Sequence, residues 1–333
     1  MSARVVVTAG LLAGVAHLGA AQQSPAVLKL DDGRQIVVSG LRRWTVPMIQ
    51  DSLARYSPSD SLQSRACAVV LRYKLHFADA AVMTLRMMPG TPDIVFVDVR
   101  EPQDSARVRY RPMLLDTLNP RPDWRVATAA MSASPGSFRS GVRAFLSQKT
   151  PPPADTLATT IARWFETRSS REDYRTALKV LGESPNFADR SVAALIVANY
   201  PDEQSTWAAL LDAMRESDSP VKDWAVGALR SVAGRNRVAP DWKVLAPSVH
   251  AMLDGTSLFV LDGFIGVLSN RAEIGPKMAR AFLSGGGEML VNFSLSPQPF
   301  RAAPAHALLV KLNGADLGAD AAAWRAWIAQ LER

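Results

Sequence analysis

The spacing of apolar positions changes near the middle of the chain. In the first half, short apolar and alternating runs predict strands, and Asp31-Asp32-Gly33 predicts a tight turn between the first two of them. Helical spacing follows Pro47 and recurs in the next apolar stretch. The predicted strands cover 27–30, 36–38, 81–87, 94–99 and 107–111, and the predicted helices 48–56 and 61–73. A hairpin, helices and then strands favour a small α+β domain over residues 22–148.

Downstream, apolar residues recur every three to four positions and strand signals nearly vanish. The clearest helix is 218–232, where Ser219 can cap, Pro220 suits the first helical position and Gly234 can end the helix. Similar helices are predicted at 155–165, 174–181, 192–197, 207–214, 242–252, 258–268, 274–283, 302–312 and 321–331, with Gly285–Gly287 as a terminator and connector. About ten helices form about five pairs of about 37 residues, within the roughly 34–47 residues of helical-hairpin solenoids.

The helix pattern resembles a known family. Asp218-x-x-Val221-Lys222-x-x-Ala225-x-x-Ala228-Leu229 is similar to the helices of HEAT repeats. The segment 313–327, with Trp324 and Trp327 one turn apart, resembles the closing helix of secreted bacterial HEAT-repeat proteins. The resemblance covers about 155–333 and implies a HEAT-like helical repeat domain at 156–333. The expected fold is therefore mainly α: a C-terminal HEAT-like α-solenoid of about five helix pairs, preceded by the small α+β domain.

Two further segments divide the chain. Residues 149–155 contain three consecutive prolines, which exclude a helix and predict a stiff linker. Residues 1–21 combine Arg4, a short apolar run and small residues, which is typical of a secretory signal peptide cleaved near Ala21. We therefore expect an exported protein, periplasmic or extracellular, with no transmembrane span after processing. An uncleaved membrane anchor is the alternative interpretation.

Charge suggests one contact surface. The chain has 38 Lys and Arg against 31 Asp and Glu. Arg107, Arg109 and Arg111 alternate with apolar residues, so a strand would present all three guanidiniums on one face. Such a stripe could contact an anionic envelope component or an acidic protein. Alternatively, the arginines are solvated or pair internally with Asp98, Glu101 or Asp104. Nucleic acid is a poor fit for an exported protein.

No motif assigns a chemistry. The single cysteine excludes an internal disulfide framework and a four-cysteine zinc module. The histidine spacings of common zinc sites are absent, as are the phosphate, dinucleotide and serine-hydrolase motifs. We assign no catalytic, cofactor or metal residue and expect a non-enzymatic scaffold that binds a protein. One alternative is an envelope enzyme with its site in the N-terminal α+β domain and the solenoid as a recognition arm, which a polar pocket around Cys67, His76 or Asp79 would favour. Another is a structural module held at the membrane by an uncleaved N-terminus.

Overall fold

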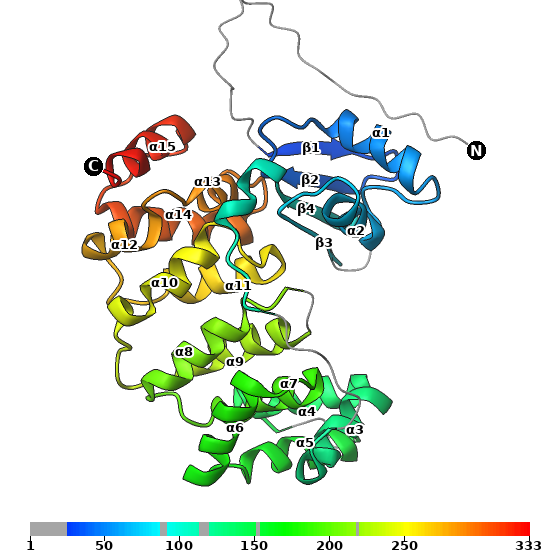
Figure 1. Ribbon diagram of the computed structural model, residues 1–333, viewed down its shortest axis with the longest axis vertical. Coiled ribbons are helices and arrows are strands. Elements are labelled where there is room, and N and C mark those ends of the chain that lie inside the picture. Colours follow the sequence, from blue (N-terminus) through cyan, green and yellow to red (C-terminus); the bar gives the residue numbers. More distant parts are fainter. Residues whose placement is uncertain (1–24, 87–91, 113–119, 151–153, 218–219) are drawn as a thin grey trace, which may run out of the picture. The chain divides into compact units, whose positions relative to one another are not determined.

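The computed structural model describes residues 25–86, 92–112, 120–150, 154–217 and 220–333, and is mainly helical with one small sheet near the N-terminus (Figure 1). The strands are β1 (Ala26–Lys29), β2 (Gln35–Ser39), β3 (Asp79–Leu85) and β4 (Ile94–Arg100). The helices of the first half are α1 (Val46–Tyr56), α2 (Arg65–Tyr73), α3 (Arg125–Ala133) and α4 (Pro135–Ser147), with 3₁₀ turns η1 (Pro102–Arg107) and η2 (Pro122–Trp124). The remaining helices are α5 (Thr156–Glu166), α6 (Arg171–Glu183), α7 (Phe187–Val197), α8 (Gln204–Ala213), α9 (Val221–Arg235), α10 (Trp242–Leu253), α11 (Leu258–Ser269), α12 (Ala279–Leu283), α13 (Glu288–Ser294), α14 (Pro299–Asn313) and α15 (Ala321–Gln330), with η3 at Pro276–Met278.

The chain forms two compact units that do not follow the sequence order. Unit 1 comprises residues 1–108, 253–262 and 283–333, and unit 2 comprises residues 109–252 and 263–282. The predicted linker 149–155 joins α4 to α5 inside unit 2, and its three prolines lie outside the described residues. These two helices pack directly, with Phe145 stacked on Phe165 at a centroid distance of 5.2 Å. The predicted signal peptide also lies outside the described residues.

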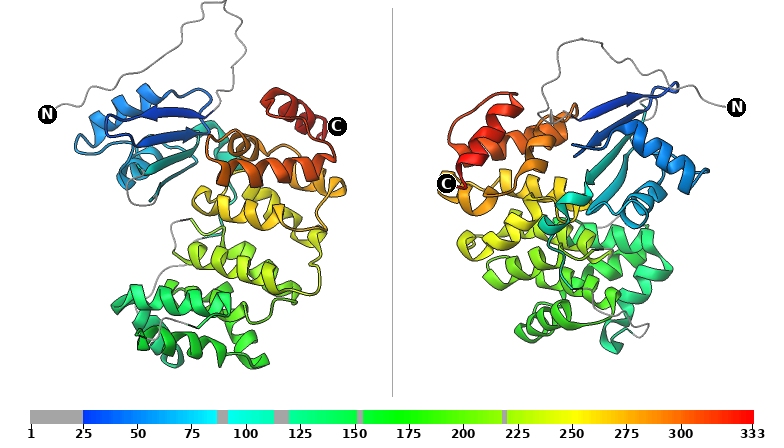
Figure 2. Two further views of the ribbon diagram at one scale, coloured as in Figure 1. Left: turned by 180° about the vertical axis from the view of Figure 1, so that it is seen from behind. Right: turned by 45° about the horizontal axis from the view of Figure 1, so that its top comes forward.

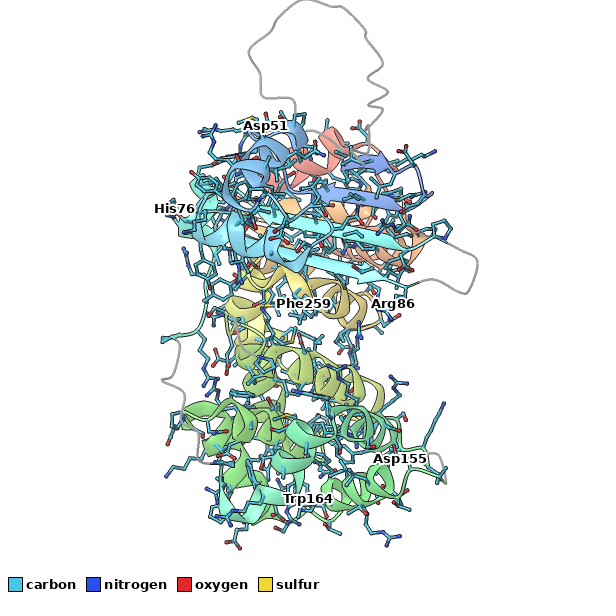
Figure 3. The ribbon with its side chains drawn as sticks, turned by 90° about the vertical axis from the view of Figure 1, so that its right-hand side faces the viewer. Asp51, His76, Arg86, Asp155, Trp164 and Phe259 are labelled. Carbon is cyan, nitrogen blue, oxygen red and sulfur yellow. The ribbon has the colours of Figure 1, made fainter. Side chains whose placement is uncertain are left out.

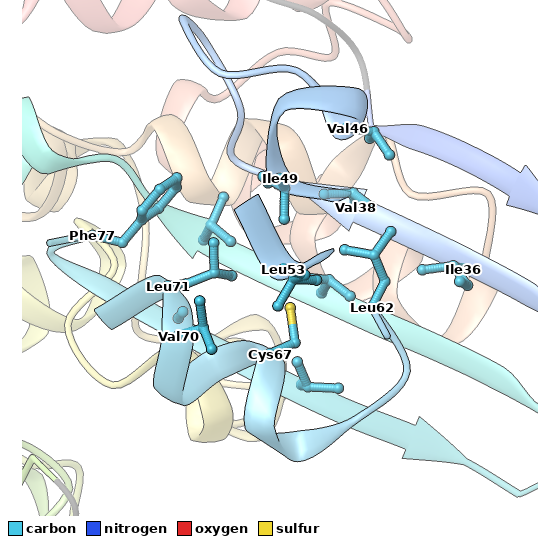
Figure 4. Close-up of a cluster of buried hydrophobic side chains, with 14 of the residues drawn as sticks. Ile36, Val38, Val46, Ile49, Leu53, Leu62, Cys67, Val70, Leu71 and Phe77 are labelled. Atoms are coloured by element: carbon cyan, nitrogen blue, oxygen red, sulfur yellow. The ribbon is translucent and has the colours of Figure 1, made fainter. Parts of the chain in front are cut away.

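The sheet of unit 1 has the order β1-β2-β4-β3. The predicted hairpin is confirmed, because β1 and β2 pair antiparallel across the Asp-Gly turn. Strand β2 then pairs parallel with β4, and β4 pairs antiparallel with β3. Alternation along β4 sends Val95, Val97 and Val99 into the core formed with α1 and α2 (Figure 4).

The opposite face of β4 carries Phe96, Asp98 and Arg100, all buried. Helices from the end of the chain cover this face: α13 packs on β2, and Phe300 at the start of α14 meets Phe96 edge-on at 5.8 Å (Figure 2). The central strands β2 and β4 are therefore buried on both sides, by α1 and α2, which lie between β2 and β3 in the sequence, and by helices from the far end of the sequence.

Several local predictions are wrong. Residues 107–111 form no strand, because η1 runs to Arg107 and the following residues pair with no strand. Gly234 lies inside α9, which continues to Arg235, and Pro220 is the N-cap residue of that helix. Ser219 lies outside the described residues. Helices α3, α4 and α13 were not predicted; α13 is a buried apolar run without an amphipathic period.

Candidate functional site

Two arginines of the predicted stripe, Arg107 and Arg111, form internal ion pairs. Arg107 lies in unit 1, where its Nε is 3.2 Å from Asp254 Oδ2 and its Nη1 is 3.9 Å from Asp104. The contact between Arg107 and Asp104 is one of the internal pairings that the sequence analysis considered as an alternative. Of the other expected partners, Asp98 pairs with Arg301, and the Glu101 carboxylate accepts backbone N–H groups of residues 42–44.

Arg109 and Arg111 belong to unit 2. The Arg111 guanidinium lies 3.5 Å from Asp212 and 3.7 Å from Glu216, and it donates to two carbonyl oxygens at the end of α6. The Arg109 carbonyl accepts a hydrogen bond from Arg215 Nε at 2.8 Å. Without a strand, no period of two places the three guanidiniums on one face.

The residues of the enzyme alternative do not form one polar pocket. Cys67 is fully buried among aliphatic side chains (Figure 4), and burial raises the pKa of its thiol to about 12. Asp79 is also buried, and its carboxylate accepts the backbone N–H of Leu258 at 3.0 Å, at the start of α11. His76 lies at the surface (Figure 3), in a left-handed backbone conformation. Cys67 and Asp79 therefore serve packing and helix capping.

A buried ion cluster joins β4 to α14 within unit 1. The Arg301 side chain is fully buried, with Nη1 2.8 Å from Asp98 Oδ1 and Nη2 2.6 Å from Asp262 Oδ2. Its guanidinium lies between the rings of Phe96 and Phe293, 3.9 and 4.3 Å from their centroids. Burial raises the pKa of Asp98 to about 6, against the attraction of Arg301. Burial alone would lower the pKa of Arg301, but the two carboxylates outweigh it, so Asp98 is the group that titrates.

A second ion cluster lies beside the first. The Arg100 side chain, also buried, is 2.7 Å from Asp254 Oδ1. Asp254 binds Arg107 as well, so this carboxylate ties the end of β4 and the η1 turn to the segment before α11. Gly255 follows at φ +95, and a Cβ there would lie 2.9 Å from Arg100 Nε. Both clusters pair their charges internally, which is the arrangement expected of structural ion pairs.

A polar cavity in the described part of unit 2 lies beside α4 and α5. Its volume is about 520 Å³, and Phe145 and Ala162 form apolar parts of its wall. Its charged lining residues are Lys149, Arg163, Glu166 and Arg235, and polar ones include Gln148, Thr150, Thr159 and Asn199. Three cations thus face one carboxylate in a cavity of small-molecule size, which falls in the range of about 300–1,000 Å³.

Two of these side chains are fixed by the ends of neighbouring helices. Asn199 Nδ2 donates at 3.0 Å to the Phe165 carbonyl in the last turn of α5 and at 3.0 Å to the Arg168 carbonyl just after it. Arg235 donates to the Ala198 carbonyl at the end of α7 and to Ser231 Oγ at 3.1 Å. Burial lowers the pKa of Arg235 from its usual value. The terminal carbonyls, which a helix leaves without an internal partner, are satisfied by these donors.

The same capping recurs one helix further along. Arg271 Nη1 donates to the Ala233 carbonyl in the last turn of α9 at 2.9 Å. Asn199, Arg235 and Arg271 are therefore spaced at 36-residue intervals. Asn199 bonds the end of α5, Arg235 the end of α7 and Arg271 the end of α9. We call these three residues the capping row. A matching aromatic row joins α8, α10 and α12, with Trp242 5.6 Å from Trp207 and 6.3 Å from Phe282.

Sequence reasoning missed both the cavity and the capping row. Lys149 was placed in a linker, and Arg163 was one polar residue on an amphipathic helix. The 36-residue spacing of the capping row is visible in the sequence, but single Asn and Arg residues are too common to mark a repeat without the contacts.

Among the described residues, no group of His, Cys, Asp and Glu could hold a metal ion. In the same part of the chain, no helix combines the length and the apolar character needed to cross a membrane. Comparisons of the chain with protein-family models, with curated proteins and with solved structures gave no significant match.

Proposed function

We propose that this chain is an exported interaction protein, and that its successive helices form a HEAT-like α-solenoid whose surface binds a protein partner. The single observation that carries the proposal is the capping row. A 36-residue period lies within the roughly 34–47 residues of helical-hairpin repeats. Proteins of this class present extended surfaces and commonly act by binding other macromolecules.

The packing within unit 2 supports the same proposal. Helix α6 packs on α7 and α8, and α7 packs on α9, so alternate helices of the sequence lie against each other. Stacked hairpins require this order, because each hairpin buries its apolar face only against the next one. The support is confined to unit 2, since α13 to α15 belong to unit 1 with the sheet.

Site-specific photocrosslinking in the producing cell tests the binding surface. Val244 on α10 is 63% exposed, and Arg280 on α12, also exposed, lies 36 residues further along the chain. A crosslinking amino acid at either position is expected to trap the same protein, because a solenoid offers equivalent positions of consecutive repeats to one partner. Tyr56, exposed on α1 in unit 1, is the control position. If neither repeat position yields a discrete adduct, or if Tyr56 yields the same adducts equally, the proposal is wrong.

Export has its own test. The proposal expects a mature protein that begins just after Ala21 and is recovered from the envelope or the medium. Intact-mass measurement of the protein from its native host decides this point, since a chain still starting at Met1 contradicts processing.

A further inference from the structure

We infer that the cavity beside α4 and α5 binds a small hydroxylated oxyanion, a sugar-like molecule bearing a carboxylate or a phosphate. The inference concerns a small ligand rather than a protein partner, so it stands or falls independently of the proposed function. It rests on the charge of the lining, on the fixed orientation of two polar groups and on the hydrogen-bonding capacity that remains.

The lining has cationic charge that the protein does not neutralise. Lys149 and Arg163 are exposed and form no ion pair with any described residue. Glu166, the single carboxylate of the lining, also forms no ion pair within the described chain. With Arg235, three cations surround one carboxylate, so the cavity carries an excess of positive charge. An oxyanion would supply the missing counter-charge through charge-assisted hydrogen bonds.

Arg235 is already oriented. Its Nε and Nη2 are engaged by Ser231 and by the Ala198 carbonyl, and Ser231 Oγ itself donates to the Leu146 carbonyl at 2.6 Å. These bonds leave both N–H groups of Nη1 and one N–H of Nη2 for a ligand. A guanidinium held in this way loses little conformational freedom on binding, which favours affinity.

The remaining polar groups select for hydroxyl groups on the ligand. Both hydrogen bonds from Asn199 Nδ2 go to carbonyls, which leaves its amide oxygen as an acceptor. Thr159 Oγ1 donates to the Asp155 carbonyl at 3.1 Å, so that oxygen too can accept. Acceptors beside cations fit a molecule that carries O–H donors next to its anionic group.

Isothermal titration calorimetry on the full mature chain tests the inference, with glucuronate and glucose 6-phosphate as probes at constant ionic strength and glucose as the neutral control. We expect binding of at least one anionic probe and none of glucose. Arg163→Gln and Lys149→Gln should each weaken binding about tenfold, as loss of one charge-assisted hydrogen bond implies. Glu166→Gln should tighten it, because the variant removes the like charge.

Arg175→Gln is the matched control, since Arg175 is an exposed arginine on α6 outside the cavity lining. It should leave the affinity unchanged, and circular dichroism should show that all four variants are folded. Binding of glucuronate alone identifies a carboxylate ligand, and binding of glucose 6-phosphate alone a phosphate ester. Absence of binding to both probes, or an equal loss in Arg175→Gln, overturns the inference.

Discussion

The Arg301 cluster gives the sharpest test of how unit 1 is held together. Arg301→Met keeps an unbranched apolar stem but removes the guanidinium, which leaves Asp98, 1% exposed, and Asp262 without their shared cation. Removing one partner of a buried ion pair typically costs about 3–5 kcal/mol, because the remaining charge is buried and uncompensated. Since the guanidinium also lies between two aromatic rings, we expect the upper part of this range at pH 8.

The cost should depend on pH. In the wild type, burial raises the pKa of Asp98 to about 6, well above the usual range of an aspartate carboxyl. A carboxyl whose pKa is raised on folding binds its proton more tightly in the folded state, so its unfavourable contribution is relieved as the pH falls from about 6 towards 4. In Arg301→Met the attraction that opposed this rise is gone, and the pKa of Asp98 rises further. At pH 5 the carboxyl is then neutral, and the penalty of the substitution should fall by at least about 1 kcal/mol.

Urea denaturation followed by circular dichroism at pH 8 and pH 5 measures both effects. The double variant Asp98→Asn/Arg301→Met should be more stable than Arg301→Met alone at pH 8, because it removes the orphaned charge. The expected coupling between the two positions is about 1–3 kcal/mol. Equal penalties at both pH values together with additive effects of the two substitutions would refute the assignment of Asp98 as the titrating partner of Arg301.

Three further predictions concern single positions. Gly40→Ala should destabilise the protein by about 3 kcal/mol or more in urea denaturation, because φ is +92 and the new Cβ would meet a backbone carbonyl at 2.0 Å, whereas Gly136→Ala, with nothing within 4 Å, should cost almost nothing. Cys67 should resist alkylation at pH 8 in the native protein and react after unfolding, as mass spectrometry would detect; rapid native labelling would contradict its burial. Arg235→Met should lower the free energy of unfolding by about 1–2 kcal/mol, because the Ala198 carbonyl loses its donor, whereas the control Arg237→Met, at an exposed position, should cause no measurable change. Equal urea midpoints for the two variants would show that the capping row does not contribute to stability.

Local signals predicted local structure well. The hairpin at 26–39, strand β4 and the helix that begins at Asp155 all form, because turn residues, alternation and caps act between neighbours in the chain. The Asp155 carboxylate caps α5 by accepting the N–H of Ala158 at 2.9 Å. The 107–111 segment failed for the converse reason: alternation predicts a strand only where another strand offers a partner edge, and η1 ends the sheet before that segment.

By itself, the sequence determined the type of most elements, the mainly helical character and the absence of the common catalytic and metal motifs, since these depend on neighbouring residues and on composition. Only the tertiary structure decided which elements meet. Asp98 and Arg301 are 203 positions apart, and no periodicity along the chain specifies that β4 buries its second face against α14. The cavity arises in the same way, because cations from α5, from the end of α9 and from the segment after α4 acquire a shared environment only when those helices pack. Which distant helices and strands pack together depends on the complementary burial of whole faces. That burial depends on many residues at once, so no single residue or local pattern predicts it.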